Sequence, residues 1–151
     1  MSRTVAYCAL ICVACFLLMV TLVAPDILSD QNEFLRGLVN HELLALLGVI
    51  LAITLASGGQ IHLSFNQIEE HYKKPGALAA ARRGVKTACF WLLGLFLVAI
   101  VIVVLKPLVP EATSWGRAFL NAAALFIIFW NVLIMVEIVQ TVFAITPRVD
   151  D

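Results

Sequence analysis

Four long runs of apolar residues constrain the fold of this chain more than any other feature. Each run has roughly the 20 residues that a helix needs to cross a hydrocarbon layer of about 30 Å. Hydrophobic residues make up 62% of the chain and charged residues only 13%, which is far from the balance of soluble domains. The sequence therefore predicts an all-α integral membrane protein, built as a four-transmembrane-helix bundle.

The runs place the spans at about residues 5–24, 43–64, 87–105 and 118–145 of a single domain, residues 1–151. The fourth run, at about 27 residues, must tilt or leave the bilayer. An alternative for the first run is a signal peptide with Arg3 as its basic start. The run is longer than the usual apolar core of about 7 to 15 residues in such peptides, and this favours a span.

Basic residues are distributed unevenly among the connections between these runs. The connection between the second and third runs holds Lys73, Lys74, Arg82, Arg83 and Lys86. The other two connections hold only Arg36, Lys106 and Arg117. Because basic loops stay on the cytoplasmic side, we expect the second connection and both termini in the cytoplasm, in a bacterial inner (plasma) membrane.

The segment SGGQIHLSFNQIEEHYKK, which follows the second apolar run, turns polar, yet its residue spacing gives no sign that the helix has stopped. It contains an apolar stripe of Ile61, Phe65, Ile68 and Tyr72. Beside this stripe, at heptad spacing, lies a polar row of Ser57, Gln60, Ser64, Gln67 and His71. We therefore expect the helix to leave the membrane and continue to about Tyr72.

A turn at Lys74-Pro75-Gly76 should follow that helix. Beyond it, Leu78, Ala81 and Val85 repeat an apolar stripe at the start of the third helix. Helices two and three should therefore extend into a short cytoplasmic helical hairpin over residues 66–86.

In the loop after the first run, apolar residues spaced close to the helical repeat predict a short helix on the outer leaflet. Asn40 is the expected cap of the second span.

The predicted hairpin carries the candidates for binding a partner protein or lipid. They are Glu69, Glu70, Lys73, Lys74, Arg82, Arg83 and Lys86. Counting outward from the turn places Glu69 and Glu70 level with Arg82 and Arg83. The alternative interpretation is a solvated turn whose basic residues only set the topology.

Polar side chains at membrane depth are the second set of candidates. They are Ser57, Gln60, His62, Ser64, Asn131, Glu137 and Gln140. His62 and Glu137 each lie about 30 Å along a helix that enters from the outer side, so they could share a proton at one depth. Helix packing, or snorkelling of the carboxylate to water, is the alternative.

The cysteines predict no redox or metal chemistry, although Cys12 and Cys15 form a CxxC pattern. This pattern lies in the middle of a span, and Cys8, Cys12 and Cys15 share one helix face, which favours a packing role. His41 and Glu42 lack the second histidine of a zinc motif. We therefore expect no catalytic residues, no metal site and no cofactor.

The leading hypothesis is a small non-enzymatic membrane protein that forms a homo-oligomer. A four-span monomer would leave the polar row facing lipid, and an oligomer would cover it. Such a protein would act as a channel-like, anchoring or signalling component of a larger system, for example in stress or phage defence. Its expected partners are the lipid bilayer, its own copies and a cytoplasmic protein contacting the hairpin, with no direct binding of nucleic acid. The alternatives are a proton-coupled transporter of ions or small solutes using His62 and Glu137 and, less favoured, a membrane redox enzyme.

Overall fold

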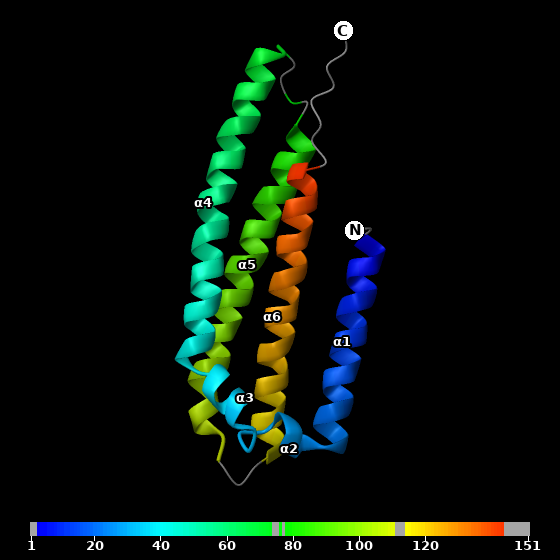
Figure 1. Ribbon diagram of the computed structural model, residues 1–151, viewed down its shortest axis with the longest axis vertical. Helices are drawn as coiled ribbons and strands as arrows, with labels where there is room; N and C mark the ends of the chain where they lie inside the picture. The colour runs from blue at the N-terminus through cyan, green and yellow to red at the C-terminus, as the bar shows by residue number, and fades with distance from the viewer. Residues whose placement is uncertain (1–2, 74–75, 77, 111–113, 144–151) are drawn as a thin grey trace.

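The computed structural model describes residues 3–73, 76, 78–110 and 114–143, and this part of the chain is helical, without strands (Figure 1). The four long helices are α1 (Arg3–Val23), α4 (His41–His71), α5 (Ala79–Leu105) and α6 (Ser114–Phe143). The short helices are α2 (Pro25–Leu28), α3 (Glu33–Leu38) and the 3-10 helix η1 (Lys106–Leu108). Each long helix is long and apolar enough to cross a membrane. The predicted all-α chain with four such helices is confirmed.

The long helices lie side by side in the order α4, α5, α6, α1, and each packs mainly on its neighbour in this series (Figure 1). One buried cluster joins α4, α5 and α6, with Leu43, Leu92 and Ile127 among its members. A second cluster joins α1, α2, α3 and α6 through residues such as Leu17 and Ala118. Because α6 belongs to both clusters, it is the central helix of the fold.

Small side chains mark the contacts of α5 and α6. Ala99, Ala118 and Ala124 are each 0% exposed. Small residues let apolar helices approach closely, which is the usual way for helices to pack where the surroundings are apolar too. This explains how α6 packs against neighbours on both sides.

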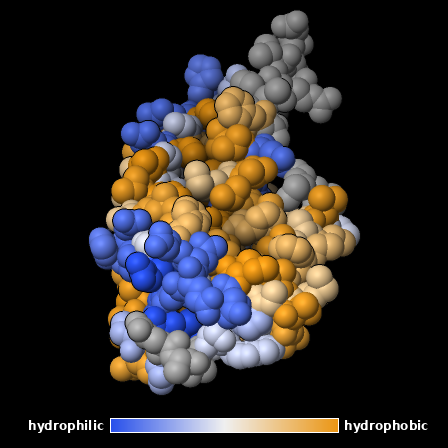
Figure 2. Space-filling view, turned by 60° about the horizontal axis from the view of Figure 1, so that its bottom comes forward, coloured by the Kyte–Doolittle hydropathy of each residue, from blue (hydrophilic) through white to orange (hydrophobic). Residues whose placement is uncertain are grey.

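The short helices α2, α3 and η1 form one end of the molecule, which we call the base. Asparagines organise it: the Asn32 side chain accepts hydrogen bonds from the backbone N–H groups of Phe34 and Leu35 and so caps α3. Asn40 caps α4 by accepting a 2.8 Å bond from the Glu42 N–H, as the sequence predicted. Figure 2 looks toward the base and shows a hydrophilic patch there, against largely hydrophobic helix sides.

The opposite end, where α4 turns into α5, extends past the end of α1 (Figure 1). With 31 residues α4 is about 46 Å long, whereas α1, with 21 residues, is about 31 Å long. The α4 helix ends at His71 with Tyr72 as its cap, close to the predicted position. Lys73 and Gly76 then adopt positive φ angles of 50° and 84°. The predicted turn residues Lys74 and Pro75, and the last two residues of the fourth predicted span, lie outside the described residues.

Candidate functional site

The polar row of Ser57, Gln60, Ser64, Gln67 and His71 is exposed along its whole length. At 100° per residue, the centre of the row lies about 130° around α4 from Gly58 and Phe65, which face α5. The Ser64 hydroxyl donates to the Gln60 backbone carbonyl of its own helix, at 3.0 Å. Within the described residues neither the Gln60 nor the Gln67 carboxamide of the row makes a hydrogen bond.

The other polar candidates are scattered over the fold. Asn131 is buried, and its side chain donates to the Ile127 carbonyl of α6 at 2.9 Å. Glu137 and Gln140 are exposed on α6. His62 is also exposed, on the face of α4 that turns toward α5. No hydrogen bond or ion pair joins His62 to Glu137 in the part of the chain that the structure describes, so the geometry gives proton sharing by this pair no support.

A groove between α4 and α5 collects several of the sequence candidates. Its volume is about 600 Å³, and most of its lining is apolar. The polar and charged side chains that line it are His62, Arg82, Arg83, Lys86 and Cys89. Helical spacing explains the grouping, since residues 82, 86, 89 and 93 follow one face of α5. Four of the predicted site residues therefore meet in one groove.

Glu69 and Arg82 close the end of this groove near the turn. The Arg82 guanidinium Nη2 lies 3.0 Å from Glu69 Oε2, and Glu69 Oε1 accepts a 2.9 Å hydrogen bond from the Leu78 N–H. The carboxylate thus joins the end of α4 to the start of α5. The other charged candidates near the turn, Glu70, Lys73, Arg83 and Lys86, are exposed, and Lys74 lies outside the described residues.

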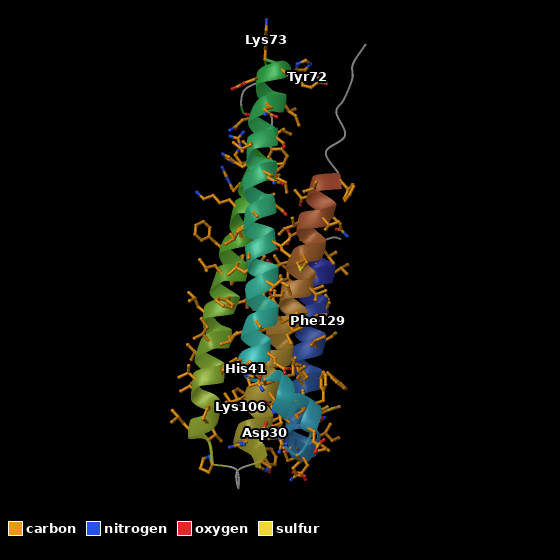
Figure 3. All side chains as sticks on the ribbon, turned by 60° about the vertical axis from the view of Figure 1, so that its left-hand side comes forward. Asp30, His41, Tyr72, Lys73, Lys106 and Phe129 are labelled. Atoms are coloured by element: carbon orange, nitrogen blue, oxygen red, sulfur yellow. The ribbon has the colours of Figure 1, made fainter. Side chains whose placement is uncertain are left out.

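A buried ionic cluster at the base was missed by the sequence reasoning. Asp30 lies at its centre, with Lys106 Nζ 2.9 Å from Oδ1 and Arg117 Nη1 2.7 Å from Oδ2. The Asn121 amide donates to Asp30 Oδ1 at 3.1 Å and to the Leu28 carbonyl at 2.8 Å. We call these four residues, Asp30, Lys106, Arg117 and Asn121, the base cluster; Figure 3 labels Asp30 and Lys106 close together there.

The base cluster ties three separate parts of the chain together. Lys106 also donates to the Val39 carbonyl at 3.1 Å, and Arg117 donates to the Val109 carbonyl at 3.2 Å. Burial raises the pKa of Asp30, but hydrogen bonds from Lys106 and Asn121 and the charge of Lys106 outweigh it, so the pKa lies below its ordinary value. Asp30 is therefore ionised and holds α6 and η1 to the α2–α3 connection.

The sequence treated Lys106 and Arg117 as loop charges, yet their side chains are only 10% and 14% exposed. One signal was present: an acidic residue and two basic residues all fall in connections predicted on the same side of the membrane. Asn121 follows Arg117 by one helical turn, which places both side chains on one face of α6. The pairing itself depends on how α6 packs against α2.

The cysteines are distributed over two helices. Cys8, Cys12 and Cys15 are exposed on α1, and Cys89 is partly buried on α5. Cys89 Sγ lies 3.1 Å from the position that a Cβ atom would take at Gly58. The absence of a side chain at Gly58 therefore allows α4 and α5 to approach closely at this point.

Comparisons of the chain with protein-family models, with curated proteins and with solved structures found no match.

Proposed function

We propose that this chain is a four-span membrane protein that assembles with its own copies through the polar row of α4 and presents the α4–α5 turn to a cytoplasmic partner. The observation that carries the proposal is the exposure of the whole polar row on a helix that is otherwise apolar enough to cross a membrane. The proposed role is that of an anchoring or signalling component, without catalysis.

The lengths of the helices support insertion with the turn outside the bilayer. A helix of about 20 residues crosses the hydrocarbon layer of about 30 Å, and α1, at 21 residues, matches this. The α4 helix is longer by ten residues, since it has 31. If the base lies at one membrane surface, the end of α4 projects about 15 Å beyond the other.

The position of Gln60 along α4 supports burial of the polar row by another chain. Gln60 lies 19 residues after His41, or about 28 Å at 1.5 Å per residue, so it falls near the edge of the hydrocarbon layer. An amide without a hydrogen-bond partner is unfavourable there, and a second copy of the row provides partners. Because the row lies on the face of α4 away from α5, it is accessible to another copy.

The oligomeric mass of the purified protein tests this proposal. We expect an oligomer in mild detergent, and Gln60→Leu should weaken association by about threefold to twentyfold, since hydrogen bonds between helices in membranes contribute about 0.6 to 1.7 kcal/mol. The measurement is the mass distribution as a function of protein-to-detergent ratio, by native mass spectrometry or sedimentation.

Gln140→Leu is the matched control. Gln140 is also an exposed glutamine at the same end of the molecule, but it belongs to α6 and lies outside the polar row. Its replacement should leave the mass distribution unchanged. A protein that is monomeric at every ratio, or equal effects of the two replacements, would refute assembly through the polar row.

A further inference from the structure

We propose that the groove between α4 and α5 is a binding site for one anionic phospholipid, with the phosphate near Arg82 and Lys86 and an acyl chain along the apolar floor. The groove volume of about 600 Å³ falls within the range of roughly 300–1,000 Å³ that is usual for sites of small ligands. This site is separate from the polar row, which lies on the other face of α4.

The two ends of the groove differ in polarity, as the two ends of a phospholipid do. Contacts at Gly58 set the register, because a Cβ atom there would lie 3.1 Å from Cys89 Sγ and 3.7 Å from Val85 Cγ1. Since α4 and α5 run in opposite directions, Leu55 then lies toward Leu93 and Phe65 toward Arg82. The groove therefore runs from a basic end near the turn to an apolar end about 16 Å away.

The charges at the basic end match a phosphate. Arg82, Arg83 and Lys86 are the charged residues among those that line the groove, and all three are basic. Glu69 neutralises part of this charge by pairing with Arg82. Basic pockets between membrane helices on the cytoplasmic side bind anionic headgroups, and Arg and Lys both bind phosphate strongly.

One hydrogen-bond donor of Arg82 is buried without a partner among the described residues. Its Nη2 donates to Glu69, whereas its Nε is buried and makes no hydrogen bond to any residue that the structure describes. A buried donor without a partner is unfavourable, so a shift of the guanidinium that brings Nε to a phosphate oxygen would be favoured. Glu69 holds the guanidinium from the side of the turn, which keeps Arg82 in position when the groove is empty.

The apolar end accommodates a hydrocarbon chain. Gly59 lines the groove, and a Cβ atom added there would meet no atom of the described residues within 4 Å. Phe90 and Leu93 form the wall on α5. Gly59 therefore offers a way to fill the apolar end without changing any charge.

Native mass spectrometry of the full-length protein tests the proposal, with dioleoyl-phosphatidylglycerol and dioleoyl-phosphatidylcholine as probes in the same detergent. We expect one phosphatidylglycerol per chain to remain bound at concentrations where phosphatidylcholine dissociates. Lys86→Gln should weaken the binding of phosphatidylglycerol by about fivefold. Gly59→Leu should weaken phosphatidylglycerol binding at least as much, because the added side chain occupies the apolar end of the groove.

Lys73→Gln is the matched control, since Lys73 is exposed near the turn and is not among the residues that line the groove. It should leave phosphatidylglycerol binding unchanged, and neither variant of the groove should lower the thermal stability of the lipid-free protein. An equal loss for Lys73→Gln and Lys86→Gln would mean attraction to surface charge in general and would overturn the site.

Two further results would overturn the proposal. Inorganic phosphate that stabilises the protein as strongly as phosphatidylglycerol would show an anion site without a lipid chain. A change in oligomeric mass on Gly59→Leu would show that a helix of a second copy occupies the groove.

Discussion

At the scale of single residues, Asp30 has the largest expected effect on stability. Its carboxylate contacts the cations of Lys106 and Arg117 at 2.9 and 2.7 Å, and all three side chains are mostly buried. Removing one partner of a buried ionic group leaves the other charges without compensation, which is more unfavourable than losing an exposed pair. The base cluster is therefore a structural element of the fold.

We expect Asp30→Asn to lower the free energy of unfolding by about 3 kcal/mol. Asp26→Asn is the control, because Asp26 lies on the same connection but is exposed. This substitution should change the free energy of unfolding by no more than about 0.5 kcal/mol. Denaturant or thermal unfolding in detergent measures both. Equal stabilities of the two variants would contradict a stabilising role for Asp30.

The stability difference between wild type and Asp30→Asn also has a defined pH dependence. The pKa of Asp30 is lower in the folded protein than in the unfolded chain, so its stabilising contribution is fully present above the unfolded pKa, near pH 4, and is lost as the pH falls through the folded pKa. The stability difference between wild type and Asp30→Asn should be constant from pH 5 to 7 and shrink below about pH 4. A difference that stays the same at pH 3 would exclude ionised Asp30 as its source.

At the scale of secondary-structure elements, α4 has two different faces. One face packs against α5 and carries Gly58, while the other carries the exposed polar row. The neighbouring glycines therefore have different surroundings. A Cβ atom at Gly58 would come within 3.1 Å of Cys89 Sγ, whereas one at Gly59 would meet nothing within 4 Å.

This difference predicts unequal effects on stability from two adjacent substitutions. Gly59→Ala should stabilise the protein by up to about 1 kcal/mol, since alanine favours a helix over glycine. Gly58→Ala should stabilise the protein less, or destabilise it, because the Cys89 sulfur must move to make room for the added Cβ atom. The free energies of unfolding of both variants measure the effect.

A Cys89→Ala background serves as the control for the glycine pair. Removing the sulfur should bring the effect of Gly58→Ala closer to that of Gly59→Ala, as a double-mutant cycle would show. Equal effects of the two glycine substitutions in the wild-type background would mean that α4 and α5 do not approach closely at Gly58.

At the scale of the whole molecule, the two ends differ in how their basic residues are placed. At the base, Lys106 and Arg117 are buried against Asp30, and Arg36 is exposed. Near the turn between α4 and α5, Lys73, Arg83 and Lys86 are exposed. Exposed basic residues remain on the cytoplasmic side, so the structure strengthens the charge asymmetry on which the proposed orientation rests.

Cysteine labelling of intact cells tests this orientation. In a background with Cys8, Cys12, Cys15 and Cys89 replaced by alanine, a membrane-impermeant thiol reagent should label Gln31→Cys. Glu70→Cys should react only after the membrane is permeabilised. Both positions are exposed, so access to the side chain does not limit either reaction. Labelling of Glu70→Cys alone in intact cells would reverse the proposed orientation.

Much of the architecture could be predicted from the sequence alone, because it depends on local composition and spacing. The four apolar runs became α1, α4, α5 and α6, and Asn40 caps α4 as expected. The extension of α4 to His71 followed from the helical spacing of the apolar residues from Ile61 to Tyr72. Helical periodicity also predicted that Phe65 and Gln60 lie on different faces of one helix. Such features are set by neighbours within a few turns of one helix.

Only the tertiary structure decided which distant residues meet. Asp30 and Arg117 are 87 positions apart, and no local pattern specifies that their side chains pair. The central position of α6 and the groove between α4 and α5 likewise depend on which helix faces pack together. Apolar faces resemble one another in sequence, so choosing among them requires side-chain shapes such as the missing Cβ of Gly58 and the fully buried Ala118. The physical reason is that periodicity identifies a face, whereas steric fit and charge pairing identify its partner.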